Sequence, residues 1–285
     1  MKNINLHIAL SAAAIVLTLS ACKKDKVDWY APVGPPLNSN VKFLNALPNS
    51  SLDYYAYFTK VKSGVKYGDS TVPYEKTAFG NIVLYATNKN QTSYRAIAPT
   101  GAANSEVNGQ GLVADFYQTV LACKTYYNGK SRGSTEKNNY KEESLILLRD
   151  KIEPSLTANI RFVHLAYDSS STSNKDSIVN FNITNGPDGP AALFQKVVYK
   201  TASNSVLIGS KGLDTPGLGP FTSGPFTSVK PGEYSFDVTQ STTSLSILKS
   251  PKTVTLKVGK YYTVYSCGII GNDLVVPRLV VVLHN

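Results

Sequence analysis

Hydrophobic and polar positions alternate with a period of two through much of the chain. In the segments 52–58 and 234–238, apolar side chains occupy every second position. This period is typical of half-buried β-strands, and no segment carries a helical stripe of useful length. Turn-forming residues, 20 Gly and 15 Pro in total, separate the short segments. We therefore predict an all-β chain built from antiparallel, immunoglobulin-like β-sandwiches.

Three sequence blocks occur twice in the same order. The paired blocks are 41–46 with 160–165, 119–123 with 263–267, and 145–148 with 279–283. The first pair shares one pattern: β-branched, basic, Phe, aliphatic, polar, apolar. Such an internal repeat predicts two tandem domains, at 41–156 and 157–285, with chance similarity between β-rich strings as the alternative. The boundary is expected near Glu153–Leu156.

The second copy contains a polar insertion rich in Gly, Pro and Ser. Within it, the sequence GPFTS at 219–223 is repeated at once at 224–228. Proline removes a backbone donor, so we predict a loop or an edge excursion here rather than a central strand. Phe221 and Phe226 either pin this loop against its own domain, which we favour, or contact a ligand.

Residues 1–21 have the pattern of a secretory signal peptide. A short basic start is followed by an apolar run from Ile8 to Leu19, whose 12 positions are fewer than the roughly 20 residues that a membrane-spanning helix needs. The run ends in Leu19-Ser20-Ala21-Cys22, which matches the lipobox of bacterial lipoproteins. We predict cleavage before Cys22 and attachment of fatty-acyl chains such as palmitate to it. An ordinary signal peptide with a chance cysteine is the alternative.

The residues after Cys22 read as a tether to a membrane. Residues 22–40 contain a basic stretch, Lys23-Lys24-Asp25-Lys26, and then a Pro/Gly/Asn-rich stretch. Because Lys23, not Asp, follows the cysteine, the familiar signal for retention at the inner membrane is absent. We expect a cell-envelope protein at the outer membrane and leave open which leaflet it faces.

Reactive side chains are scarce. The three His and three Cys residues lack the spacing of a metal site, and we predict neither a metal nor a cofactor. We expect His164 to be a semi-buried structural histidine and His284 to be solvated. Cys123 and Cys267 stand at equivalent places in the two copies, and we expect them to be buried free thiols. No catalytic residue is assigned.

Charge and aromatic content suggest partners only in outline. The net charge of +10 favours anionic lipid headgroups or acidic glycans, whereas the compartment and the lack of a dense basic stripe argue against nucleic acid. The aromatic residues Tyr54, Tyr55 and Tyr57 could stack on sugars. Ser70 and Ser177 each follow an Asp, as in acceptor motifs for O-glycosylation, and we treat both as hypotheses.

Several segments resemble a known family. The quoted stretches are the strand openings 41–46 and 159–164, the turn 229–234, the strand 259–264 and the ending 283–285. They are similar to lipoproteins with tandem copies of domain of unknown function 4397, found in Bacteroidetes-type envelopes. In the first copy, Phe79-Gly80-Asn81 replaces the expected Pro-Gly turn, which leaves the register of its strands open. The resemblance implies a β-sandwich and an envelope location, and it implies no activity.

These observations lead to one functional expectation and two alternatives. We expect a non-catalytic envelope lipoprotein that presents two β-sandwich modules to a protein or glycan partner. The first alternative is a structural or accessory subunit of an outer-membrane assembly. The second, which we favour least, is a hydrolase acting on glycans or peptides, for which no site geometry is apparent.

Overall fold

The computed structural model describes residues 38–285 with several internal gaps. The gaps are 57–58, 71–72, 78–79, 83, 90–97, 100–109, 113–116, 129–138, 169–176, 205 and 209–220. Leu37–Asn285 form one compact unit. Among the described residues all regular structure is β, which confirms the predicted all-β class. Cys22 and most of the tether lie outside the described residues.

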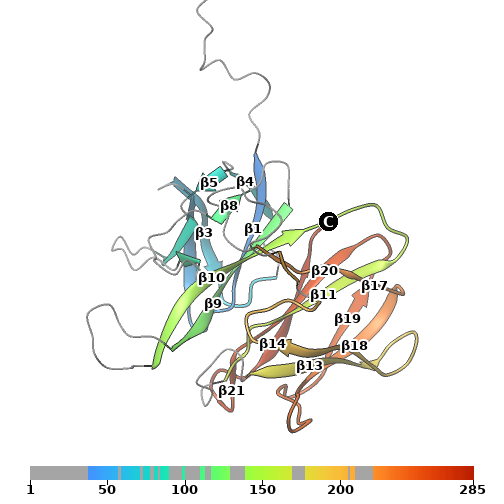
Figure 1. Cartoon of the computed structure of the whole chain (residues 1–285). Helices are drawn as coiled ribbons and strands as arrows, with labels where there is room; N and C mark the ends of the chain where they lie inside the picture. Colours follow the sequence, from blue (N-terminus) through green and yellow to red (C-terminus); the bar gives the residue numbers. More distant parts are fainter. Residues whose placement is uncertain are drawn as a thin grey trace, which may run out of the picture. The chain divides into compact units, whose positions relative to one another are not determined.

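The first half of the chain forms a sandwich of two main sheets (Figure 1). One sheet has the order β4-β1-β9-β10, and the other has the order β3-β2-β6. A short pair, β5-β8, and the small strand β7 complete this half. The strands are β1 (Ser39–Asn45), β2 (Ser51–Ala56), β3 (Thr59–Lys66), β4 (Tyr74–Thr77), β5 (Gly80–Ile82), β6 (Leu84–Asn88), β7 (Ala98–Pro99), β8 (Gln110–Leu112), β9 (Tyr117–Asn128) and β10 (Asn139–Asp150).

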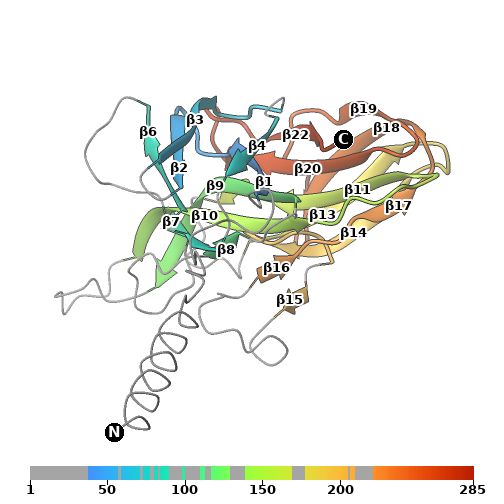
Figure 2. The same ribbon diagram turned by 90° about the horizontal axis from the view of Figure 1, so that it is seen from above.

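The second half repeats this plan (Figure 2). Its sheets have the orders β17-β11-β20-β22 and β14-β13-β18-β19, with a short β12-β21 pair. The strands are β11 (Ala158–His164), β12 (Tyr167–Asp168), β13 (Ile178–Asn185), β14 (Ala191–Val198), β15 (Val206–Ile208), β16 (Phe221–Ser223), β17 (Thr227–Val229), β18 (Gly232–Gln240), β19 (Lys252–Leu256), β20 (Tyr261–Cys267), β21 (Ile269–Ile270) and β22 (Arg278–Leu283).

The strand register matches between the halves at the positions that the repeated sequence blocks align. β1 runs parallel to β9 with Lys42 opposite Thr119, and β11 runs parallel to β20 with Arg161 opposite Thr263. In each half the closing strand, β10 or β22, then pairs antiparallel with β9 or β20. The parallel central pairs are a difference from the purely antiparallel sandwich that we expected. They arise because the first strand of each half, β1 or β11, lies beside the strand that pairs with the closing strand, β9 or β20.

The central sheets are buried on both faces. All seven residues of β11 and all seven of β20 are buried, as expected for parallel pairs covered on two sides. On β11, Phe162 packs with Phe181 and Phe236 of the facing sheet in its own half. The next residue, Val163, belongs instead to a cluster that contains Leu44 of the first half.

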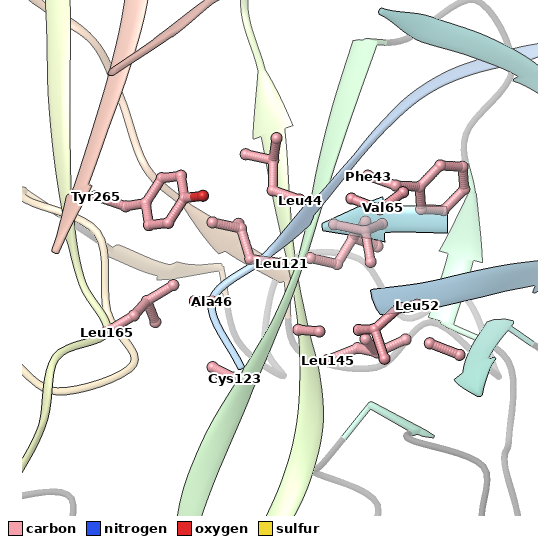
Figure 3. Close-up of a cluster of buried hydrophobic side chains, with 14 of the residues drawn as sticks. Phe43, Leu44, Ala46, Leu52, Val65, Leu121, Cys123, Leu145, Leu165 and Tyr265 are labelled. Carbon is pink, nitrogen blue, oxygen red and sulfur yellow. The ribbon is translucent and has the colours of Figure 1, made fainter. Parts of the chain in front are cut away.

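The two halves therefore share a hydrophobic core. Figure 3 shows Tyr265 and Leu165 of the second half beside Leu44 and Leu121 of the first half, with Phe43 on the far side of the first-half sheet. Burial of apolar surface contributes about 25 cal/mol per Å². This shared cluster stabilises the contact between the halves. The predicted boundary at Glu153–Leu156 lies between β10 and β11 and stays a prediction.

The polar insertion contributes strands to the other half. β16 pairs parallel with β10 of the first half, and β15 pairs with β16. β17, which contains the end of the second GPFTS repeat, lies at the edge of the second-half sheet, as predicted for that segment. For the end of the first repeat the prediction of a loop or an edge excursion is wrong, because β16 pairs with β10 on one side and with β15 on the other.

Candidate functional site

A buried ion pair joins the halves. Arg161 on β11 and Asp150 at the end of β10 are 0% and 2% exposed, and Nη2 of Arg161 donates a hydrogen bond to Oδ1 of Asp150. Arg161 also donates through Nε to Oγ1 of Thr263 (2.8 Å) and through Nη1 to the carbonyl oxygens of Arg149 and Gly224 (both 3.2 Å). A buried charge needs such partners, because an uncompensated one costs several kcal/mol.

The equivalent cation of the first half makes the equivalent contact. Lys42 aligns with Arg161 in the repeat and is 4% exposed. Its Nζ donates to the carbonyl oxygen of Leu283 at 3.0 Å and lies 4.6 Å from the ring centre of Tyr74. The register makes Leu283 the counterpart of Arg149, so each half sends one cation to the closing strand of the other half.

The residues at the ends of the closing strands also correspond, but their chemistry differs. Asp150 accepts a hydrogen bond through Oδ2 from Oγ1 of Thr119 at 2.6 Å. At the equivalent place His284 is 6% exposed, with Nε2 2.7 Å from Oγ1 of Thr263 and Nδ1 2.5 Å from the phenol oxygen of Tyr74. The expectation that His284 is solvated is therefore wrong. The first-half residue Tyr74 covers its ring.

The titration of this cluster follows from its burial. Burial lowers the pKa of His284 to about 3, with Arg161 and Lys42 adding to the effect and Asp150 opposing it. Oδ2 of Asp150 lies 3.7 Å from Nδ1 of His284 and raises the pKa of the imidazole, but burial of the ring, together with Arg161 and Lys42, outweighs this effect. Burial opposes ionisation of Asp150, but Arg161 and the other partners hold the pKa of Asp150 below its usual value.

Burial also prevents acid–base chemistry in this cluster. Burial, together with Asp150, raises the pKa of the Tyr74 phenol far above its ordinary value, so the phenol stays protonated. His284 is a poor base because its pKa is far below neutral. The groups are locked to one another and the histidine is almost fully covered. The cluster therefore reads as a structural joint between the halves.

A second buried histidine has the same character. His164 is fully buried, with Nδ1 3.0 Å from Oγ of Ser266 and Nε2 3.1 Å from Oγ of Ser177. Burial lowers its pKa to about 3. Oγ of Ser266 also accepts hydrogen bonds from the backbone N–H groups of Leu165 and Ala166. This serine is therefore tied to the turn after β11, and the structural role predicted for His164 agrees with these contacts.

An open groove lies along β22. Its volume is about 530 Å³. Three cationic side chains, Lys249, Lys252 and Arg278, lie in its lining and are exposed. The lining residues are Gly68, Ser70, Lys249, Ser250, Pro251, Lys252, Val276, Pro277, Arg278, Leu279, Val280 and Val281. They include no carboxylate, histidine or cysteine, so this groove offers positive charge, hydroxyl groups and backbone rather than a catalytic set.

Arg278 is held in place by the loop after β3. Its guanidinium lies 4.7 Å from the ring centre of Tyr67, and Nη2 donates to the Tyr67 carbonyl oxygen at 3.2 Å. Gly68 has a φ of +67°, and a Cβ on it would come within 2.1 Å of Nη2 of Arg278. Only glycine combines this left-handed backbone with space for the guanidinium.

The aromatic residues proposed as ligand contacts are scattered. Tyr54 is fully buried, and its phenol donates to the Leu44 carbonyl oxygen at 2.6 Å, so it presents no surface to a ligand. Tyr55 is half-buried and stacks on Tyr85. Tyr57 lies outside the described residues.

Of the two phenylalanines in the insertion, the structure describes the side chain of Phe226. Phe226 is half-buried, makes edge contacts with Tyr261 and His284 and lies under the Arg161 guanidinium, at 4.5 Å. This contact is the pinning role that we favoured for it. For Phe221 only the backbone, in β16, is described.

The two proposed glycosylation sites differ in access. Ser177 is 4% exposed and its hydroxyl contacts His164, so a glycan there would need this contact to open. Ser70 is half-buried and lines the groove. Whether either is modified remains a prediction, as does lipidation of Cys22.

Cys123 and Cys267 are buried free thiols, as expected. Both belong to the cluster shared by the halves, which differs from the separate cores assumed in the prediction. Burial raises the pKa of Cys267, so its thiol is not activated. Among the described residues, no group of three potential metal ligands comes together.

The sequence pattern pointed to some of these residues and not to others. The sequence contained a signal for the buried cations. Arg161 lies between the apolar residues Ile160 and Phe162, and Lys42 has the same kind of neighbours. Strands with such apolar neighbours are buried in the core, so their basic residues could have been predicted to be buried as well. Lys249, Lys252 and Arg278 carry no signal in the sequence, because only the packing of separate loops brings them together.

Comparisons with known proteins add little to this description. No protein-family model matches the chain, and no curated protein matches it. Among solved structures, a proposed cell adhesion protein from Bacteroides uniformis aligns over 87% of this chain and 98% of its own, with 8% identity and a TM-score of 0.22. Another from Bacteroides fragilis aligns over 81% and 83%, with 9% identity and a TM-score of 0.20.

In the described part of the chain, no helix is long and apolar enough to cross a bilayer.

Proposed function

We propose that this chain is a non-catalytic lipoprotein of the cell envelope, of the tandem domain of unknown function 4397 type, that binds a partner through the groove along β22. One observation carries the proposal: a groove of about 530 Å³ whose lining combines three cations with no carboxylate, histidine or cysteine. Grooves with one sign of charge concentrate ligands of the opposite sign. The buried histidine clusters are locked into the fold and do not favour catalysis.

The binding half of the proposal is tested with arrays of acidic and neutral glycans and peptides, probed with the full chain purified in detergent. We expect anionic probes to bind, and the double variant Lys249→Glu/Lys252→Glu to lose about tenfold in affinity, since like charges at a rim slow association. The matched control is Lys196→Glu/Lys257→Glu, which changes the same charge at exposed positions outside the groove lining. Equal affinity of both variants, or no binding to any anionic probe, overturns the proposal.

The anchor half is tested in cells. Cys22 is proposed to become the acylated first residue, and several acyl chains give stable membrane attachment because each buried methylene contributes about 0.8 kcal/mol. We expect Cys22→Ser to move the protein from the membrane fraction to the soluble fraction, and globomycin to leave the precursor unprocessed. A Cys22→Ser protein that still sediments with membranes overturns the anchor.

A further inference from the structure

β22 has an unpaired edge that faces the groove. Within the described part of the chain, β22 pairs only with β20. The N–H of His284 donates to the carbonyl oxygen of Tyr261 on β20. In an antiparallel pair, the backbone N–H and C=O groups of alternate residues point to the same neighbour, so those of Val282 and Val280 also point to β20. Leu279 and Val281 consequently turn their N–H and C=O groups away from the sheet, and both residues line the groove.

In the other half, the equivalent edge is filled. β10 corresponds to β22, and strands of the same chain lie along its outer side: β7 opposite Ser144–Leu145 and β16 opposite Leu148–Arg149. Both run parallel to β10. The fold therefore accepts parallel strands at this edge of the repeated sheet.

The strands that cover β10 come from two connections, and the register assigns each to a different part of β22: β16 to Val282–Leu283 and β7 to Arg278–Leu279. In the second half, 28 residues separate β14 from β17, and this segment includes the β16 strand that covers β10. In the first half, only seven residues separate the equivalent strands β3 and β4. Of these, Gly68 and Ser70 form one wall of the groove. The short connection supplies no strand beside Val282–Leu283, and no described strand of the second half takes the place of β7 beside Leu279.

On the basis of the proposed binding function, we propose that β22 takes up an extended acidic peptide as an added parallel strand. Strand addition uses main-chain hydrogen bonds for affinity and side-chain contacts for specificity. Here Leu279 and Val281 offer the main-chain groups, and Lys249, Lys252 and Arg278 offer charge to carboxylate side chains at alternate positions of the peptide. An open strand edge is otherwise a liability in a folded protein.

Charge argues for a foreign partner over the chain's own segments. The tether contains Lys23-Lys24-Asp25-Lys26, which adds positive charge to a cationic groove. A second copy of this chain has a net charge of +10 and would be repelled for the same reason. An acidic peptide from another envelope protein fits both the edge and its charge.

The probe is an end-blocked octapeptide of Thr and Val with Glu at alternate positions, measured by fluorescence anisotropy on the full chain in detergent. We expect binding that weakens at least tenfold when Lys replaces Glu. Two further peptides carry N-methyl groups on their backbone amides, one peptide at the even positions and the other at the odd positions. In an added strand only the N–H groups of alternate residues can bond to β22. We therefore expect the peptide that is methylated at these N–H groups to lose binding and the other peptide to keep it. Equal behaviour of the two peptides overturns strand addition.

A protein variant tests the same edge from the other side. Val281→Pro removes an N–H that faces the groove, and proline is tolerated on edge strands. We expect it to weaken peptide binding at least tenfold with little change in thermal stability, while Lys257→Glu leaves binding unchanged. Amide exchange of Leu279 and Val281 should slow when the octapeptide binds. If Val281→Pro fails to fold, the amide exchange of Leu279 and Val281 and the binding of the two N-methylated peptides still test strand addition.

The outcomes separate this inference from the proposed function. Acidic glycans that bind and respond to Lys249→Glu/Lys252→Glu, with no binding of the octapeptide, overturn strand addition and leave the groove as a binding site. No binding of either probe overturns both. Concentration-dependent dimerisation that the octapeptide does not reverse, and that Val281→Pro abolishes, makes a second copy the occupant and overturns the acidic partner.

Discussion

His164 and His284 should make the stability of this chain depend strongly on pH between neutrality and pH 3. Burial lowers the pKa of both imidazoles to about 3, from an ordinary value of 6.5. Each group is therefore neutral in the folded chain and takes up a proton in the unfolded chain once the pH falls below 6.5. Stability is fully present above pH 6.5 and is lost progressively as the pH falls towards 3.

The size of the effect follows from these two values. At pH 5, an unfolded histidine with a pKa of 6.5 gains about 2 kcal/mol from protonation that the folded one does not gain. Two such groups lower the free energy of unfolding by about 4 kcal/mol relative to pH 7.5. This is a large part of the roughly 5–15 kcal/mol that stabilises a typical domain.

The measurement is urea unfolding at pH 7.5 and pH 5, followed by far-ultraviolet circular dichroism. His164→Gln and His284→Gln keep a polar side chain at each site but cannot titrate. Each variant should lose about half of the pH-dependent drop, and the double variant nearly all of it. A wild-type drop below about 1 kcal/mol, or single variants with the full drop, would refute the assignment of neutral, buried histidines.

Three further predictions concern contacts within the fold and the groove. Asp150→Asn leaves the buried Arg161 guanidinium without its carboxylate and should cost about 3–5 kcal/mol in urea unfolding; a cost below 1 kcal/mol contradicts the ion pair. Gly68→Ala should strain the backbone by about 1–2 kcal/mol and displace Arg278, seen as a lower Tm and weaker binding of acidic peptides. Tyr54→Phe removes the buried hydrogen bond that the phenol donates to the Leu44 carbonyl oxygen and should cost about 1 kcal/mol in thermal unfolding, with peptide binding unchanged.

The sequence was sufficient to align the halves because local pattern reflects local structure. Strands buried on both faces are rich in apolar residues, and a basic residue between apolar neighbours is rare enough in them to mark a position. Lys42 and Arg161 were aligned on this basis, and the strand register places them opposite Thr119 and Thr263. The alternation around Tyr54 likewise predicted its strand, although Tyr54 points into the core.

Features that depend on distant parts of the chain could not be predicted in this way. His284 is next to the last residue of the sequence, which suggests exposure, yet Tyr74, 210 positions away, closes over it. The insertion contains few apolar residues, and nothing in its composition indicates that β16 would pair with β10 of the other half. The groove has the same origin, because its walls come from loops that are about 180 residues apart in the sequence.

Comparison of the halves explains why one edge is closed and the other open. Hydrogen bonds from the two buried cations hold the closing strands in both halves. Arg161 donates to the Arg149 carbonyl oxygen on β10, and Lys42 donates to the Leu283 carbonyl oxygen on β22. Both cations therefore contribute to the contact between the halves at the ends of β10 and β22. Beyond these ends the constraint disappears, and the connection before the edge strand can differ in length without disturbing the joint. On β10, β16 covers Leu148–Arg149 and β7 covers Ser144–Leu145, whereas in the described part of the chain no strand lies along Leu279 and Val281 of β22, which face a cationic groove.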